Sequence, residues 1–264
     1  MMHLGLIGHP LGHSLSSKIH TAALKACGLE GEYSLFPIAP EDMQGLKDLL
    51  TRVRGGEIHG LNVTIPHKQN VIPLLDELTP TAQAIGAVNT ISMRNGKLVG
   101  DNTDAPGFMA DLGGLKTSEV SKALVLGAGG SARAVVYALV YAGWDVTLSA
   151  RRPEQAQALA SNYHLPITNL INPPTFNLLV NATPLGMTPN VNASPWPDHL
   201  PFPKDAAVYD LVYNPRETKL VRDARAQGLP ARTGLGMLIE QAALAFEIWT
   251  GHRPPREVLF EAVQ

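Results

Sequence analysis

Short apolar runs alternate along the chain with segments whose apolar residues recur at helical spacing. The first run, residues 3–8, predicts a buried strand. Residues 16–27 follow with helical periodicity, and Gly28 comes where that helix would end. Ser16 is a suitable N-terminal cap for it. An alternation of strand and helix patterns is typical of α/β proteins, which is the fold class we expect.

The same alternation continues to the C-terminus. The further predicted strands are 33–38, 60–65, 87–93, 97–100, 123–126, 145–149, 178–180 and 208–212, and the further predicted helices are 43–53, 105–112, 131–142 and 237–250. Asn95-Gly96 is expected to join two strands in a tight hairpin turn, and Pro66 to stop strand 60–65. Because a strand–glycine–helix pattern starts afresh after residues 100–107, we expect a domain boundary there.

The composition restricts the class of protein. With 264 residues, 45% of them hydrophobic, the chain is long enough to bury a core of its own. Charged residues make up 17%, below the usual ~25%, which argues against an intrinsically disordered chain. The formal net charge of −2 provides no basic surplus for nucleic acid or an anionic membrane.

Three further observations favour the cytoplasm. Cys27 is the single cysteine, so neither an internal disulfide nor a cysteine-cluster metal site is expected, and this usage fits a reducing compartment. Residues 1–10 lack the pattern of a secretory signal. Residues 134–144 form the longest run of apolar residues plus glycine, far short of the ~20 residues needed to cross a bilayer. We therefore expect a soluble cytoplasmic protein that binds neither membrane nor nucleic acid.

A glycine pattern follows predicted strand 123–126 and opens the next predicted helix. In Gly127-x-Gly129-x-x-Ala132, Gly127 permits the tight turn and Gly129 lets the backbone approach a pyrophosphate. Ala132 lets the helix pack close to the strand, and the helix N-terminus offers N–H donors to the phosphates. The alternative is an ordinary glycine-rich turn. In this position the pattern favours a dinucleotide site.

The end of the next predicted strand indicates which dinucleotide. A site for NAD usually places an acid there to accept from the ribose hydroxyls. Here the residues are Ser149-Ala150-Arg151-Arg152, with no acid before Glu154. Because guanidiniums bind a ribose 2′-phosphate that a carboxylate would repel, we expect NADP. The alternative is that either arginine is only a solvated residue at a strand end.

Polar residues gather at strand ends and helix starts in the first third of the chain. Ser14 and Ser16 lie beside a predicted helix N-terminus, where two hydroxyls suit a carboxylate, although N-capping explains one of them and can explain both. Lys68 follows a predicted buried strand, where it can donate a proton or, like most lysines, face solvent. Asp104 begins a helix, which suits a cap and a functional carboxylate equally.

Two amides interrupt apolar patterns. Asn89 lies inside the apolar stretch 85–91, and a buried amide must be hydrogen-bonded, to the protein or to a ligand. Gln241 lies at helical spacing from apolar residues of the last predicted helix, so it is expected on the inward face. It is therefore either a hydrogen-bonding core residue or a ligand-binding one.

Neither a metal centre nor a serine nucleophile is expected. His13, His20 and His67 are close in the sequence but lack the spacing of metal-binding motifs. The chain also lacks a Gly-x-Ser-x-Gly elbow.

These scattered residues belong to a series of motifs that follow one another along the chain. The motifs are His13-Ser14-Leu15-Ser16, Asn62-Val63-Thr64-Ile65-Pro66-His67-Lys68, Gly86-Ala87-Val88-Asn89-Thr90, Asn102-Thr103-Asp104, Gly127-Ala128-Gly129-Gly130, Asn181-Ala182-Thr183-Pro184-Leu185-Gly186-Met187, Val212-Tyr213-Asn214-Pro215, Gly236-Met237-Leu238 and Gln241-Ala242. In this order they make the chain resemble the shikimate dehydrogenase family over essentially its whole length. The resemblance implies the reversible NADPH-dependent reduction of 3-dehydroshikimate to shikimate, in the biosynthesis of chorismate and the aromatic amino acids.

The resemblance also implies roles for individual residues. For the substrate, it implies that Ser14, Ser16 and Tyr213 hold the carboxylate, that Thr64, Lys68, Asn89, Asp104 and Gln241 hold the ring hydroxyls and the reacting carbonyl, and that Lys68 and Asp104 are the catalytic pair. For NADP, the implied residues are Gly127, Ala128, Gly129, Gly130, Ser131, Ala150, Arg151, Arg152, Thr183, Met187, Leu211 and Gly234. Residues around Thr183, Met187 and Gly234 would line the nicotinamide.

The family's layout implies two domains. Residues 1–103 with 237–264 would form an N-terminal α/β substrate-binding domain, to which the C-terminal helices return, and residues 104–236 a Rossmann-like NADP-binding domain. The partners would be small molecules, and the protein a monomer or a homodimer.

The chain departs from the family pattern at two places. Ser17 replaces a frequent proline, with no expected consequence. Ala150-Arg151-Arg152 stands where the family typically has Asn-Arg-Thr, so we expect Arg152 to replace the lost adenosine-side contacts with a second charge. Two alternatives remain: an enzyme of the same fold that oxidises quinate, and a non-catalytic NADP-binding regulator.

Overall fold

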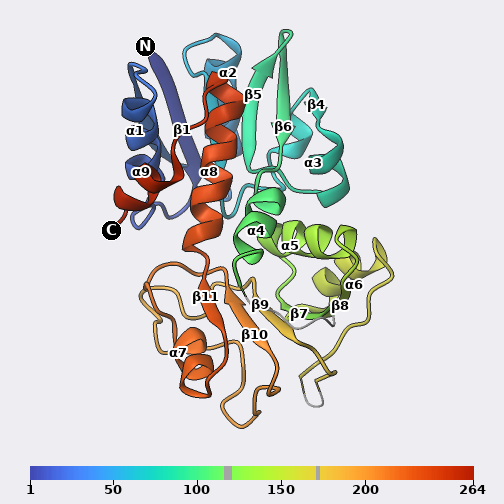
Figure 1. Cartoon of the computed structure of the whole chain (residues 1–264). Coiled ribbons are helices and arrows are strands. Elements are labelled where there is room, and N and C mark those ends of the chain that lie inside the picture. The colour runs from blue at the N-terminus through green and yellow to red at the C-terminus, as the bar shows by residue number, and fades with distance from the viewer. Residues whose placement is uncertain (116–120, 171–172) are drawn as a thin grey trace. The chain divides into compact units, whose positions relative to one another are not determined.

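The computed structural model describes residues 1–115, 121–170 and 173–264. The chain divides into two compact units, each described here by itself (Figure 1). We call Met1–Asp104 with Ile239–Gln264 the N-terminal unit, and Ala105–Leu238 the central unit. The chain passes between them within two helices, α4 (Asp104–Leu112) and α8 (Leu235–Thr250).

Six strands of the described residues form one mixed sheet in the N-terminal unit, in the order β2-β1-β3-β5-β6-β4. They are β1 (Met2–Gly8), β2 (Gly31–Pro37), β3 (Gly60–Val63), β4 (Glu77–Leu78), β5 (Thr90–Arg94) and β6 (Lys97–Asp101). Strand β5 is antiparallel to both of its neighbours, and the other adjacent pairs are parallel. The predicted hairpin turn is confirmed, since Asn95 and Gly96 join β5 to β6 with φ angles of 51° and 76°.

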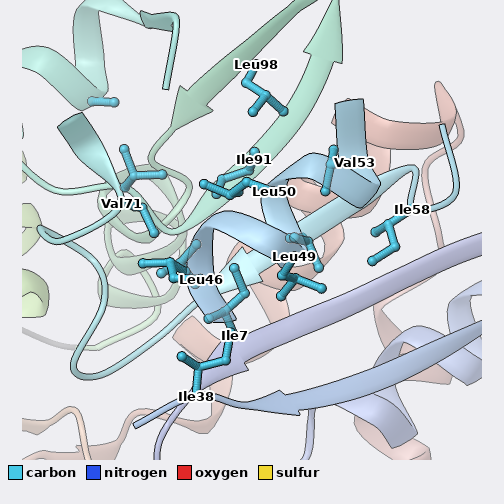
Figure 2. Close-up of a cluster of buried hydrophobic side chains, with 14 residues drawn as sticks. Ile7, Ile38, Leu46, Leu49, Leu50, Val53, Ile58, Val71, Ile91 and Leu98 are labelled. Carbon is cyan, nitrogen blue, oxygen red and sulfur yellow. The ribbon is translucent and has the colours of Figure 1, made fainter. Parts of the chain in front are cut away.

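A hydrophobic cluster forms where α2 packs onto this sheet (Figure 2). The helices of the unit are α1 (Ser16–Ala26), α2 (Met43–Arg54), α3 (Pro80–Ile85), α9 (Arg256–Glu261), the larger part of α8 and the 3₁₀ turn η1 (Ile72–Leu74). In α2, helical spacing places Leu46, Leu49, Leu50 and Val53 on one buried face. Burial of each such side chain contributes roughly 1.5–3 kcal/mol, which fixes α2 on the sheet.

Helix α8 approaches the sheet closely at Gly60. A Cβ atom on Gly60 would lie 2.3 Å from Cδ1 of Trp249 in α8. The indole Nε1 of Trp249 donates a 3.0 Å hydrogen bond to the carbonyl of Ile91 in β5. Since only glycine leaves room for this ring, the contact fixes α8, and with it Gln241, against the strands of its own unit.

Five strands of the described residues form an all-parallel sheet in the central unit, in the order β11-β10-β9-β7-β8. They are β7 (Lys122–Leu126), β8 (Asp145–Ser149), β9 (Leu178–Asn181), β10 (Ala207–Asp210) and β11 (Ala231–Thr233), accompanied by α5 (Gly130–Tyr141), α6 (Pro153–Ser161) and α7 (Lys219–Ala226). The strand order reverses between β7 and β9. In open α/β sheets, ligands bind beyond the carboxyl ends of the strands at such a point.

The expected α/β class is thus confirmed, but some predicted boundaries are wrong. Strand 60–65 ends at Val63, because the chain turns at Thr64, whose carbonyl accepts from the His67 amide at 2.9 Å. Strand 87–93 begins at Thr90, since the Val88 amide bonds to the Lys68 carbonyl instead. Strand 208–212 ends at Asp210.

The predicted cap of α1 is also wrong. The helix begins at Ser16, and the capping position belongs to Leu15, which makes no side-chain capping bond. The Oγ of Ser14 instead accepts from the Ser16 amide at 3.2 Å. The predicted stop is confirmed, since Gly28 follows the helix with a φ of 65°. None of the helices formed by the described residues is long and apolar enough to span a bilayer.

Candidate functional site

A buried ion pair joins Lys68 and Asp104. The Nζ of Lys68 donates to the Oδ2 of Asp104 at 2.5 Å, and the two side chains are only 10% and 6% exposed. Lys68 follows the turn after β3, where its carbonyl accepts from the Val88 amide at 2.8 Å. Asp104 begins α4, and its amide donates to the Oδ1 of Asn102 at 3.1 Å. These hydrogen bonds hold the backbones of both residues, and the Asp104 carboxylate holds the ammonium itself.

Asn89 connects this pair to the last long helix. Its Nδ2 donates to the Oδ1 of Asp104 at 2.9 Å and to the Oε1 of Gln241 at 3.2 Å. Its Oδ1 accepts from the Thr103 amide at 2.8 Å and from the Thr90 hydroxyl at 2.9 Å. Protein groups thus satisfy the buried amide. The result is a cluster of four polar side chains, each at most 9% exposed, drawn from segments as far apart as positions 68 and 241.

The other predicted substrate residues of the N-terminal unit lie at strand ends. The Thr64 amide donates to the Ile7 carbonyl at 2.8 Å, so Thr64 stands where parallel strands β1 and β3 both end. Ser14 and Ser16 lie in the loop and first turn after β1. Ser16 is buried, and Ser14 is half-buried. Because Lys68 also follows β3, these side chains follow the carboxyl ends of neighbouring strands.

Tyr213 belongs to the central unit, where it follows β10. Burial raises the pKa of its phenol. Its expected pairing with the two serines of the N-terminal unit stays a prediction.

The glycine loop after β7 has the geometry that its sequence predicts. Gly127 has a φ of 116°, and a Cβ there would lie 2.9 Å from the carbonyl oxygen of Ala182, which follows β9. Gly129 is different: a Cβ there would meet no heavy atom within 4 Å. Protein packing therefore does not demand glycine at position 129. The open space lies directly before α5, where N–H groups and the positive end of the helix dipole suit a pyrophosphate.

The residues after β8 suit an anionic ribose. Arg151 and Arg152 are both exposed, and the first carboxylate after the strand is that of Glu154, in the first turn of α6. Two guanidiniums without an intervening acid fit a 2′-phosphate better than a 2′-hydroxyl. The residues present in the central unit thus fit NADP.

Segment 183–187 carries Thr183 and Met187, which are expected around the nicotinamide together with Gly234, and segment 211–214 carries Leu211, which is expected to bind NADP. Met187 is 44% exposed. Gly234 has a steric role of its own, since a Cβ there would lie 2.3 Å from the Leu211 carbonyl oxygen. Both segments are anchored by Asp210, a fully buried carboxylate that the sequence reasoning missed. Its signal in the sequence was an acid directly after the apolar run 206–209.

In the part of the chain that the structure describes, three or more His, Cys, Asp or Glu side chains nowhere gather in a way that could hold a metal ion.

Comparison with known proteins relates these observations to one family. The model of the shikimate dehydrogenase substrate binding domain matches residues 6–91, and that of the shikimate 5′-dehydrogenase C-terminal domain matches residues 234–264. The shikimate dehydrogenase (NADP(+)) of Salinibacter ruber is 44% identical over 275 residues, covering 98% of this chain and 95% of the relative.

Solved structures extend the similarity. That of shikimate 5-dehydrogenase from Thermus thermophilus, in complex with NADP(H) and shikimate, superposes with a TM-score of 0.90 at 43% identity, covering 99% of this chain and 98% of that one. The ligand-free 5-ketofructose reductase of Gluconobacter sp. strain CHM43 gives a TM-score of 0.88 at 31% identity, covering 99% and 97%.

Proposed function

The chain belongs to the shikimate dehydrogenase family, and we propose that Lys68 and Asp104 are its catalytic pair. It is an NADP-dependent oxidoreductase of the shikimate pathway that reversibly reduces 3-dehydroshikimate to shikimate. The N-terminal unit carries the substrate, and the central, Rossmann-like unit carries NADP. The observation that supports the catalytic assignment is the buried ammonium of Lys68, held 2.5 Å from the Asp104 carboxylate.

NADPH, when bound, supplies the hydride. As the hydride reaches the ring carbonyl of 3-dehydroshikimate, negative charge grows on the carbonyl oxygen. A Lys68 ammonium that donates a hydrogen bond to this oxygen stabilises the transition state more than the ground state. Lys68 then gives up its proton to complete the hydroxyl of shikimate. Asp104 orients the ammonium and accepts from a neighbouring ring hydroxyl.

The remaining substrate roles follow from the same proposal. Asn89 and Gln241, which touch each other in the cluster, hold ring hydroxyls together with Thr64. The carboxylate of the substrate is held by Ser14, Ser16 and Tyr213. The hydroxyl and amide groups of these residues, together with the Lys68–Asp104 ion pair, suit a ligand that carries several hydroxyls and one carboxylate.

The cofactor side uses the carboxyl end of the parallel sheet. Residues 127–131 hold the pyrophosphate, and residues 150–152 hold the adenosine side with its 2′-phosphate. The nicotinamide is lined by Thr183, Met187, Leu211 and Gly234. What supports these roles is the open space before α5 and the exposed arginine pair after β8.

The direct test follows NADPH absorbance with 3-dehydroshikimate, 3-dehydroquinate and 5-ketofructose, each with NADPH and with NADH. The third ketone is included because one structural relative is a 5-ketofructose reductase. We expect rapid oxidation of NADPH with 3-dehydroshikimate and weak activity in the other combinations. Faster turnover of 3-dehydroquinate would favour the quinate enzyme, and NADPH binding without turnover of any ketone would favour the regulator.

Location and assembly complete the proposal. A cytoplasmic enzyme agrees with the single cysteine, Cys27, which is a free thiol. We expect a monomer or a homodimer, to be distinguished by light scattering of the purified protein.

A further inference from the structure

Three fully buried polar side chains meet at the carboxyl end of the parallel sheet. Asn181 ends β9, Asp210 ends β10, and Thr218 caps the N-terminus of α7, where its hydroxyl accepts from the Val221 amide. Such groups are costly to bury, so a cluster of three calls for an explanation beyond core packing.

Asp210 is the acceptor that organises this cluster. Its Oδ1 accepts from the Nδ2 of Asn181 at 2.8 Å and from the Val212 amide at 3.0 Å. Its Oδ2 accepts from the Thr218 hydroxyl at 2.6 Å. An ionised carboxylate accepts only, and here it receives three donors from three different segments. Burial raises the pKa of Asp210 to about 6, against the opposing effect of these hydrogen bonds.

Asn181 carries the constraint into segment 183–187. Its Oδ1 accepts from the Thr183 amide at 2.9 Å and from the Thr183 hydroxyl at 2.7 Å. Its Nδ2 also donates to the Leu185 carbonyl at 3.2 Å. The amide group of Asn181 thus has its donors on Asp210 and Leu185 and its acceptor on Thr183. Any rotation of this side chain would release the segment.

The second segment, 211–214, is held from the same carboxylate. The Val212 amide bonds to Asp210 itself. Further along, the backbone carbonyl of Asn214 accepts from the Thr188 amide at 3.1 Å, and the side-chain Oδ1 of Asn214 accepts from the Thr188 hydroxyl at 3.2 Å. Segments 183–187 and 211–214 are therefore connected near their starts through Asn181 and Asp210, and near their ends through Thr188 and Asn214.

We propose that Asp210 is a positioning residue, which fixes segments 183–187 and 211–214 in the arrangement that holds the nicotinamide for hydride transfer. The inference rests on the proposed function, which places Thr183, Met187 and Leu211 around that ring. Asp210 is fully buried, and its carboxylate accepts hydrogen bonds from Asn181, Val212 and Thr218. It acts through Asn181 and the Val212 amide, and none of these hydrogen bonds goes to residues 127–131 or 150–152.

The test compares Asp210→Asn and Thr218→Val with the wild type. Thr218→Ser is the matched control, because serine keeps both the hydroxyl donor and the helix cap. Three quantities are measured: kcat with 3-dehydroshikimate, the isotope effect with NADPH deuterated at the transferred position, and the dissociation constants of NADPH and of 2′-phospho-ADP-ribose. The last ligand keeps the phosphates and adenosine but has no nicotinamide.

In Asp210→Asn and Thr218→Val we expect kcat to fall on the order of 10²-fold, the loss that a displacement of about 1 Å produces. The isotope effect should rise, because hydride transfer becomes the slow step. The affinity for 2′-phospho-ADP-ribose should equal that of the wild type, while the additional affinity for NADPH disappears. Thr218→Ser should keep the wild-type kcat, isotope effect and ligand affinities.

A folded variant with normal kcat, a normal isotope effect and undiminished preference for NADPH over the fragment would overturn the inference. If Asp210→Asn does not fold, Thr218→Val decides the question. A merely structural role would lower the urea midpoint and leave the isotope effect unchanged. Since the comparison of the two ligands needs no turnover, it tests Asp210 even if the wild type reduced none of the ketones, an outcome that would refute only the proposed function.

Discussion

The Nζ of Lys68 and the Oδ2 of Asp104 lie 2.5 Å apart, with both side chains nearly excluded from solvent. Removing one partner of such a pair costs roughly 3–5 kcal/mol, because the other charge is left buried and uncompensated. The pair is therefore a sensitive site for mutation. Asn89 contacts the second carboxylate oxygen, so neither oxygen of Asp104 is idle.

Lys68→Ala should lower kcat by about 10²–10³, the usual effect of removing a donor to a developing oxyanion. The KM for 3-dehydroshikimate should change little, since the lost interaction forms mainly in the transition state. Initial rates of NADPH oxidation measure both parameters. Lys25→Ala, at an exposed position of α1, is the control and should behave as the wild type. A near-normal kcat in Lys68→Ala would remove Lys68 from the mechanism.

Asp104→Asn should also lower kcat, because an amide neither holds the ammonium electrostatically nor accepts its hydrogen bond as strongly. If the two residues act as a unit, Asp104→Asn combined with Lys68→Ala should be about as slow as the slower single variant. A double-mutant cycle on kcat provides the measurement. Multiplicative losses would show that the two side chains act independently.

Gln241→Ala should raise the KM for 3-dehydroshikimate more than it lowers kcat, because its amide is assigned to a ring hydroxyl and not to the reacting oxygen. The variant also leaves Asn89 with one acceptor fewer, at a cost of about 1 kcal/mol in unfolding free energy. Steady-state kinetics and urea unfolding measure the two effects. Gln44→Ala, on the exposed face of α2, is the control. An unchanged KM would exclude Gln241 from the substrate site.

Arg151→Ala and Arg152→Ala should each weaken NADPH binding and leave the weaker NADH-dependent rate unchanged, because only NADPH carries the 2′-phosphate. Both side chains are exposed, so the variants should fold normally. Titration of each variant with both cofactors measures the effects separately. If Arg152→Ala binds NADPH as the wild type does, the second arginine does not replace the family's lost contacts.

Acid should destabilise the N-terminal unit through His20. This ring is fully buried and stacked on Tyr33 at 4.3 Å, and burial lowers its pKa to about 3, an effect that Asn62 only partly opposes. Above pH ~6.5, His20 is neutral in both states and stability does not depend on it. Between pH ~6.5 and 3 only the unfolded chain takes up the proton, so stability falls by up to about 1.4 kcal/mol per pH unit.

The measurement is the urea midpoint at pH 7 and pH 5 for the wild type and for His20→Phe, which keeps a stacked ring but cannot be protonated. The loss on acidification should be smaller in His20→Phe. Equal losses in the two proteins would show that other groups determine the acid sensitivity.

Where the chemistry depends on neighbouring positions, the sequence by itself was sufficient. The Asn95-Gly96 turn, strand β8 and the glycine loop before α5 all follow from local residue order, because backbone φ angles and hydrophobic periodicity act over a few residues. The motif order also identified the family. Boundaries were wrong where the chain leaves the sheet for other hydrogen bonds: backbone bonds at Thr64 and Val88, and a side-chain bond at Asp210, whose carboxylate accepts from the Val212 amide.

Only the tertiary structure decided which polar residues meet. From the sequence alone, Lys68 could equally be a solvent-exposed lysine and Asp104 a helix cap. The hydrogen-bond partner of Asn89 could not be identified. Folding brings the residue before β5, the start of α4 and helix α8 together, so that Asn89 contacts Asp104 and Gln241. Asp210 was not recognised at all, because one acid after an apolar strand has no pattern of its own. Burial and hydrogen bonding between distant segments depend on packing, and packing leaves no fixed spacing in the sequence from which such a contact can be read.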